Sequence, residues 1–285
     1  MLMSSLQMLS RRLKMDDELN QILIEIICDK TGKVLPLLER VIGGDRIRKA
    51  ERIVEIVQSV QSDNPEPNWE LGQSLNELAG VYYEKGTISS LKDAIETQNR
   101  TLEVYSKDTT PMQWAMTQYN LGIALRTLGG QQSGKEGVAR LNKAITAFQN
   151  ALEVRTKDTA SMYWAGAQHN LGLALQTLGT RQSGQDAIAR LNEAITAFQN
   201  ALEVYTKDSA PMQWAMTQEN MAFVYLVRAT FFDGAQEQTK ADLEQAMFHV
   251  DAEFGVLDPA HSPYYHEKAT TTRELILSAL IAPTG

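Results

Sequence analysis

The eight-residue string "PMQWAMTQ" at Pro111–Gln118 returns letter for letter at Pro211–Gln218. A diverged copy, "SMYWAGAQ", occupies residues 161–168, midway between the other two. The tryptophans of the three copies therefore stand 50 residues apart, and later stretches such as "AITAFQNALEV" are repeated as well. A fixed pitch of this kind is the signature of a repeat protein, in which each copy forms one supersecondary unit.

Each copy contains two segments with helical periodicity. In the second segment, hydrophobic side chains recur at steps of three and four residues, at Val138, Leu141, Ile145, Phe148 and Leu152. This spacing places them on one face of an α-helix, and no sustained alternation favours a strand. A helix pair with one hydrophobic stripe cannot bury that stripe alone, whereas stacked pairs bury it against one another. We therefore predict an all-α protein built from stacked helix pairs.

Local signals mark the ends of the predicted helices. Thr110–Gln113 has the pattern of a capping box with proline at the first helical position, and Ser133–Glu136 has the pattern of a second one. Gly129 and Gly130 are expected to end the first helix of their copy.

The repeat pattern also divides the chain. Residues 1–62 are expected to form an N-terminal helical cap, and residues 257–285 a C-terminal capping helix at about 264–281. The repeats between them are assigned to residues 65–256, as the four units 65–108, 109–158, 159–208 and 209–256.

These motifs resemble the tetratricopeptide repeat, whose pattern is N-L-G-x-A-Y…G followed by A-x-x-x-F/Y-x-x-A-L. In the second unit the consensus places are filled by Leu121, Gly122, Ala124, Gly129, Ala144, Phe148, Ala151 and Leu152. The usual period is about 34 residues, and here it is 50. Most of the additional residues fall between the two helices, so a long loop and helix start are expected there, as in bacterial and especially cyanobacterial multidomain proteins.

The resemblance implies a right-handed α-solenoid that acts as a non-catalytic scaffold or adaptor. A protein or peptide partner would bind the concave face, which is lined by the first helix of each unit. An alternative is a regulatory or sensor module that controls a separate bacterial effector, such as a caspase-like protease or an NTPase. By the same resemblance, the partner-binding residues are Tyr119, Ile123, Arg126, His169, Leu173, Gln176, Glu219, Phe223 and Leu226. Because these positions differ between near-identical copies, we interpret them as facing a non-repeating ligand, with drift at exposed positions as the alternative.

A second candidate surface lies near the N-terminus. The segment "DRIRKAERIVEIVQSV" has helical periodicity and carries Arg46, Arg48, Lys49 and Arg52. These side chains form either a solvated basic face or a docking patch for an acidic partner.

Two strings hint at chemistry without supplying it. Gly129–Lys135 spells GxxxxGK, but it follows a helical segment rather than a strand, and the next copy has Gln185 in place of the lysine. His261 and His266 stand among prolines with no standard metal-ligand spacing. No catalytic signature is present, so we expect no enzymatic activity, no cofactor and no metal.

Composition narrows the setting. The net charge of −8 argues against a nucleic-acid partner. The single cysteine, Cys28, lies in an apolar run and is interpreted as a buried small hydrophobe, which suits a reducing compartment. With no signal-peptide pattern and no apolar run of the ~20 residues that a membrane span needs, the protein is expected in the cytoplasm.

Overall fold

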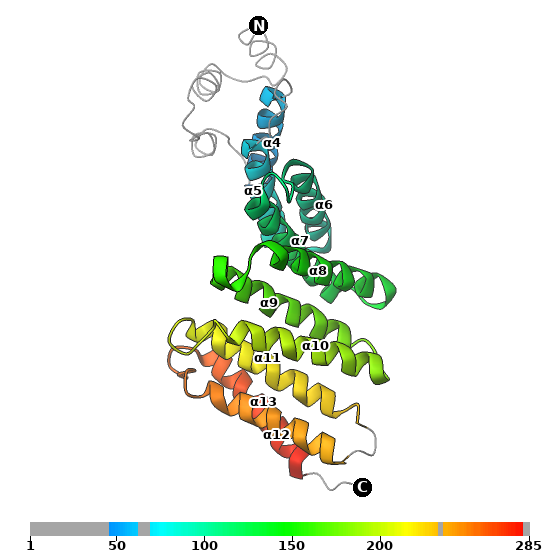
Figure 1. Ribbon diagram of the computed structural model, residues 1–285, viewed down its shortest axis with the longest axis vertical. Coiled ribbons are helices and arrows are strands. Elements are labelled where there is room, and N and C mark those ends of the chain that lie inside the picture. The colour runs from blue at the N-terminus through cyan, green and yellow to red at the C-terminus, as the bar shows by residue number, and fades with distance from the viewer. Residues whose placement is uncertain (1–45, 62–68, 233–235, 282–285) are drawn as a thin grey trace. The chain divides into compact units, whose positions relative to one another are not determined.

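The computed structural model describes residues 46–61, 69–232 and 236–281, and in these residues every regular element is an α-helix (Figure 1). The prediction of an all-α protein is therefore confirmed. The helices are α4 (Arg46–Gln61), α5 (Trp69–Lys85), α6 (Ile88–Val104), α7 (Pro111–Gln131), α8 (Gly134–Val154), α9 (Lys157–Gly179), α10 (Gly184–Leu202), α11 (Pro211–Ala229), α12 (Gln236–Glu253) and α13 (Pro263–Ile281).

The chain divides into two compact units, residues 1–124 and 125–285, and the boundary falls inside α7. In the first unit α4 packs on α5, and α5 packs on α6. In the second unit each helix from α8 to α13 packs on the next one in the chain (Figure 1). Consecutive packing of this kind is the arrangement expected of stacked repeats.

Within the second unit the helices alternate between two roles. We call α9, α11 and α13 the A helices and α8, α10 and α12 the B helices. The A helices also touch one another, because α11 contacts both α9 and α13. The helix expected over about 264–281 is α13, and its contact with α11 places it in the row of A helices.

Both rows of helices contribute buried side chains to the core, and α10 illustrates the contribution of the B helices. In α10 the stripe Leu191, Ala194, Phe198 and Ala201 is completely buried. Full burial of a phenylalanine side chain contributes roughly 1.5–3 kcal/mol. Phe198 lies so close to Gly172 of α9 that a Cβ on this glycine would stand 2.6 Å from the ring. The consensus glycine is therefore required by the close approach of the ring.

The helix ends differ from the expectation in two ways. α7 continues through Gly129 and Gly130 and ends at Gln131, so only two residues separate it from α8. The expected long loop is wrong, and the additional residues lengthen the helices instead. Gly129 serves close packing, since a Cβ there would lie 3.1 Å from Leu141 Cγ. Gly134, with φ of +68°, adopts the left-handed conformation that reverses the chain.

The predicted capping boxes do not form as expected. Ser133 makes no side-chain hydrogen bond at the start of α8, and the Thr110 hydroxyl bonds Ser106 instead. Reciprocal hydroxyl pairs form one turn earlier, where the Thr156 and Thr159 side chains each accept a backbone N–H from the other residue. The residues Thr156–Thr159 thus form the first turn of α9, and the non-helical Ala160 (φ −156°, ψ 58°) separates this turn from the rest of the helix.

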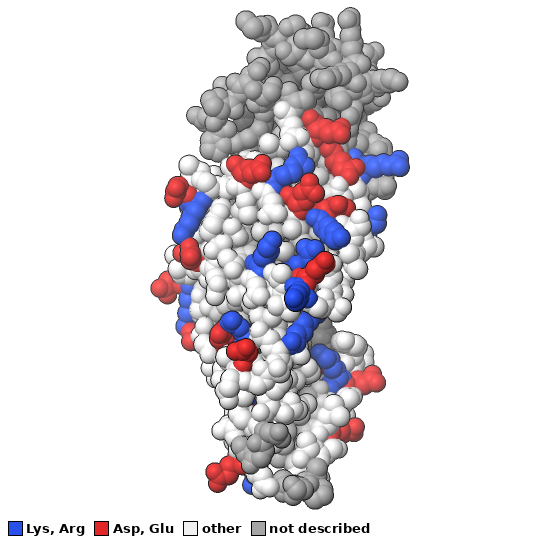
Figure 2. Space-filling view, turned by 90° about the vertical axis from the view of Figure 1, so that its right-hand side faces the viewer, with Lys and Arg blue, Asp and Glu red and all other residues white. Residues whose placement is uncertain are grey.

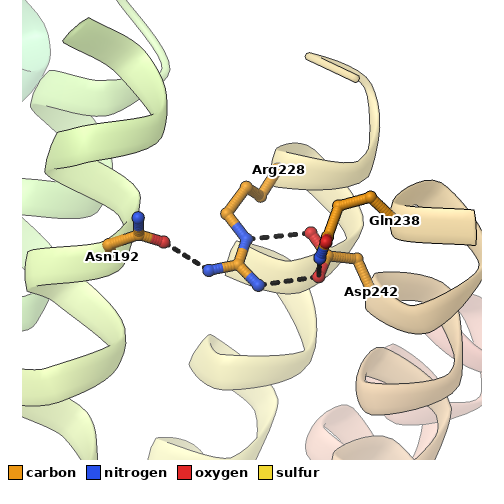
Figure 3. Close-up of polar contacts among 4 residues, drawn as sticks. All are labelled: Asn192, Arg228, Gln238 and Asp242. Atoms are coloured by element: carbon orange, nitrogen blue, oxygen red, sulfur yellow. Dashed lines mark hydrogen bonds and ion pairs between the residues drawn. The ribbon is translucent and has the colours of Figure 1, made fainter. Parts of the chain in front are cut away.

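A buried polar cross-link joins three helices of the second unit (Figure 3). Arg228 of α11 donates Nε to Asp242 Oδ2 at 2.8 Å and Nη2 to Asp242 Oδ1 at 2.7 Å. The same guanidinium donates to the Asn192 side chain of α10, and Gln238 donates to Asp242 at 3.4 Å. Asp242 is buried, so this two-pronged pair satisfies a carboxylate that would be costly to leave alone.

None of the helices in the described residues combines the length and the apolar character that crossing a lipid bilayer requires.

Candidate functional site

The A helices of the second unit share a partly exposed side, which we call the A-helix face. On each helix its residues are three, four or seven positions apart, so they form a single stripe. α11 touches both α9 and α13. His169 of α9 contacts Thr217 of α11, and Lys268 of α13 contacts Glu219 of α11, so residues of the stripes take part in both helix contacts. The face consists of Met162, His169, Leu173 and Gln176 of α9, Met216, Glu219, Phe223 and Leu226 of α11, and Tyr264, Lys268 and Leu275 of α13.

Large apolar side chains on this face remain open to solvent. Met162 is 47% exposed, Phe223 40%, Leu275 57% and Tyr264 68%. Single exposed hydrophobic residues are ordinary, but several on adjacent helices form the kind of patch that marks an interaction surface. Methionine suits such a surface because its flexible thioether adapts to different partners.

His169 is held inside the stack. Its Nδ1 lies 2.8 Å from the Thr217 hydroxyl of α11, and its ring meets Phe198 and Tyr205 edge-on. Because Thr217 donates its own proton to the Gln213 carbonyl, the hydroxyl accepts from His169 Nδ1–H. Burial, together with the nearby charge of Arg126, lowers the pKa of His169 to about 4. The ring is therefore neutral at pH 7 and joins α9 to α11.

Glu219 is also paired with a side chain of the neighbouring helix α13. It is buried, and Lys268 Nζ of α13 lies 2.7 Å from its Oε1. Burial, and after it the charge of Glu219, raises the pKa of Glu253 on α12 to about 9, against the opposite effect of Lys268. Glu253 therefore keeps its proton at neutral pH, and the A-helix face presents a charge-balanced pair at this point.

The other sequence-predicted positions are divided between the two compact units. Leu173, Gln176 and Leu226 are half-buried on α9 and α11 of the second unit, as is Arg126 at the end of α7. Tyr119 and Ile123 are half-buried on the part of α7 that belongs to the first unit. Phe223 is the most exposed of the set in the second unit.

The repeat position of His169, which Asn76 occupies in the first repeat, makes contacts between helices that the sequence analysis did not predict. In the first unit Asn76 donates to Thr117 at 3.5 Å, and in the second unit His169 meets Thr217. The first pair joins α5 to α7, and the second pair joins α9 to α11. In both copies this position therefore bonds a threonine of the following repeat, and its role toward a binding partner stays a prediction. The sequence could have indicated this contact only through a comparison of residues about one repeat apart, such as His169 and Thr217, which are 48 positions apart.

Several members of the face were missed as well. Tyr264, Lys268 and Leu275 come from α13, which carries no repeat motif. Met162 stands two turns before His169, and Met216 stands one turn before Glu219. The recurring methionines were the available signal.

The basic N-terminal segment lies on α4, where Arg48 is exposed. The side chains of Arg46, Lys49 and Arg52 lie outside the described part of the structure. On the surface drawn in Figure 2, basic and acidic side chains intermingle over the described residues.

The GxxxxGK string bridges the end of α7 and the start of α8, and it borders an open cavity of about 670 Å³. Arg181 also lines this cavity, but its guanidinium donates to the carbonyls of Gly129, Gly130 and Gln132 at 2.7–2.8 Å. A P-loop follows a β-strand, whereas this string follows a helix. The arginine here caps a helix C-terminus.

His261 and His266 do not converge. His261 Nδ1 lies 2.6 Å from Asp258 in an exposed turn, and His266 packs against Phe254. Across the described helices and turns, no three histidine, cysteine or acidic side chains gather as metal ligands would.

Comparison with known proteins adds no identity: no protein-family model matches the chain, and no curated protein matches it significantly.

Proposed function

We propose that the protein is a non-catalytic scaffold that binds a protein or peptide segment on the A-helix face. The observation that carries the proposal is the row of exposed apolar side chains that crosses α9, α11 and α13, with Phe223 on the middle helix. In a right-handed solenoid of the tetratricopeptide type, this would be the concave face.

The chemistry of the face favours a mixed apolar and polar segment, such as an amphipathic helix. Methionine, leucine and phenylalanine side chains offer contact area, and the one ion pair, Lys268 with Glu219, is already internally balanced. A helix docks on such surfaces through apolar residues spaced one turn apart. The overall charge of −8 fits a protein partner in the cytoplasm better than a nucleic acid.

Site-specific photo-crosslinking in the native host tests the proposal. A benzophenone amino acid is placed at Phe223 on the A-helix face, and in a control chain at Thr196, which is exposed on the B helix α10. We expect a discrete adduct from position 223 alone. The same adducts from both positions, or from position 196 alone, would contradict the assignment of the face.

The captured partner then allows a quantitative test. Truncation of an anchor aromatic costs about 1 kcal/mol or more of binding free energy. Phe223→Ala should therefore weaken binding at least about fivefold by calorimetry, with the helical content unchanged. Thr196→Ala serves as the matched control and should bind like the parent.

A further inference from the structure

The first unit encloses a cavity of about 140 Å³ between α5, α6 and the adjoining part of α7. Gly80 and Tyr83 line it from α5, Gln98 lines it from α6, and Asn120 and Ile123 line it from α7. Three alanines complete the wall. None of the residues that line the cavity belongs to the A-helix face.

The repeat register explains why this cavity exists. When "LKDAIETQNRTLEV" at 91–104 is aligned with "LNKAITAFQNALEV" at 141–154, Gln98 takes the place of Phe148. The third sequence repeat, residues 159–208, has Phe198 at this position, and both phenylalanines are completely buried. Phe198 packs on Gly172, whose place in the first unit is taken by Ala79. The first sequence repeat thus lacks the phenylalanine ring that is buried at this position in the second and third repeats.

The same register explains how the cavity opens. Gly80 occupies the position held by Ile123, Leu173 and Phe223 in the later units. A Cβ added to Gly80 would meet no atom within 4 Å, and the residue is exposed. Where the other units place a large side chain over the interior, the first unit therefore leaves an entrance.

Gln98 supplies a specific polar group inside. The residue is only 3% exposed, and its Oε1 has no hydrogen-bond partner. A buried acceptor that has lost water and gained no donor is unfavourable, so almost all such groups in proteins are paired. An occupant that brings a donor to this oxygen would remove that cost.

We propose that the cavity binds a phenol-class ring. The ring occupies the space that phenylalanine fills in the other units, and its hydroxyl donates to Gln98 Oε1. The size agrees, because a buried apolar cavity of about 150 Å³ holds one benzene molecule. The ring comes either from a free phenol or from a tyrosine side chain of a peptide, since both present the same chemistry.

Binding of small probes to the full chain tests the proposal. Ligand-observed NMR titrations would use p-cresol, toluene, which lacks the donor, and N-acetyl-tyrosinamide. We expect p-cresol to saturate the protein with a dissociation constant of about 1 mM, a reasonable affinity for a fragment of this size, and toluene to bind at least about tenfold more weakly. Equal affinity for N-acetyl-tyrosinamide and p-cresol identifies a tyrosine residue as the natural source, and exclusive binding of p-cresol identifies a free phenol.

Four variants locate the site. Gln98→Phe combined with Ala79→Gly rebuilds the internal ring and should abolish binding, and Gly80→Leu should close the entrance and weaken binding at least about tenfold. Gln98→Leu should remove the preference for p-cresol over toluene. Asn99→Gln, an exposed neighbour that also acquires the residue of the later units, is the matched control and should bind like the parent.

Three results would overturn the assignment. The first is the absence of saturable p-cresol binding to the parent, and the second is equal binding of p-cresol and toluene. The third is p-cresol binding that survives both Gly80→Leu and the ring-restoring double variant, provided that circular dichroism shows each to be folded.

Discussion

The helix pair α5–α6 in the first unit and the pair α9–α10 in the second follow one repeat pattern but fill their interiors differently. In α9–α10 the Phe198 ring lies on Gly172 and is completely buried. In α5–α6 the corresponding residues are Gln98 and Ala79, and a cavity of about 140 Å³ remains. The helical framework is therefore kept by the rest of the stripe, including the fully buried Leu91, which leaves this interior position free to diverge.

The helices α5 and α9 also differ in how they contact the second helix after them in the chain. Asn76 of α5 reaches Thr117 by a 3.5 Å amide–hydroxyl bond, whereas His169 of α9 meets Thr217 at 2.8 Å. The second contact contains a titratable ring and the first does not. The comparison teaches that a repeated position keeps its geometric role while its chemistry changes from copy to copy.

The largest expected change in stability comes from placing at position 198 the glutamine that the first repeat has at the equivalent position. Phe198→Gln removes a fully buried ring and buries an amide, so we expect a loss of about 3–5 kcal/mol in the free energy of unfolding. Urea denaturation followed by circular dichroism measures it, with the exposed Gln199→Ala as control. A loss under about 1 kcal/mol would show that the ring is not the packing centre of the pair.

Lowering the pH should weaken the contact of His169 with Thr217 but not the contact of Asn76 with Thr117. The pKa of His169 is about 4 in the folded chain against 6.5 as its ordinary value. The unfolded chain therefore takes up the proton first, and the contribution of His169 is complete above pH 6.5 and lost as the pH falls toward 4. We expect a loss on the order of 1–3 kcal/mol between pH 7 and pH 4.

His169→Asn installs the residue of the first repeat and should remove part of that acid loss. His249 keeps a share, because burial lowers its pKa to about 4 as well. The control is Thr196→Ala, which is exposed on α10 and removes no titratable group, so it should leave the pH dependence of the melting temperature unchanged. An identical acid profile for His169→Asn and the parent would contradict the role of His169.

The reverse exchange should stabilise the first unit. Gln98→Phe with Ala79→Gly fills the cavity and removes the unpartnered buried oxygen, so we expect a gain of about 1–2 kcal/mol. Thermal unfolding should show a higher midpoint than in the parent, while Asn99→Gln should not change it. A lower midpoint would mean that the first pair cannot accommodate the ring.

The smallest effect concerns the junctions. Arg155 stands where the first and third repeats have Tyr105 and Tyr205, and its guanidinium lies 4.2 Å from the Tyr163 ring centroid. Tyr163 in turn replaces the glutamine of the other copies. A double-mutant cycle with Arg155→Tyr and Tyr163→Gln should give a coupling of about 0.5–1 kcal/mol. Additive effects of the two changes would show that the exchanges are unrelated.

Much of the fold could be read from the sequence because helical periodicity is a local property. The steps of three and four that join Leu191, Ile195, Phe198 and Leu202 determine which side of α10 meets its neighbours, whatever those neighbours are. The same argument marked α9 and α11, and the repeat pitch predicted the order of the helix pairs. Phe223, assigned to a binding face by family resemblance, is exposed on α11, and its role in binding stays a prediction.

Other features depend on which residues of different copies meet, and periodicity within one helix carries no such information. The contacts of His169 with Thr217 and of Glu219 with Lys268 join residues 48 and 49 positions apart. The continuation of α7 past Gly129 follows from its fit against Leu141, and the hollow at Gln98 follows from what the surrounding helices fail to fill. The sequence by itself determined an all-helical array and the buried side of each helix, because those follow from spacing along the chain. Only the tertiary structure decided which polar side chains bond to one another between repeats and where a cavity remains, because both depend on distances between helices.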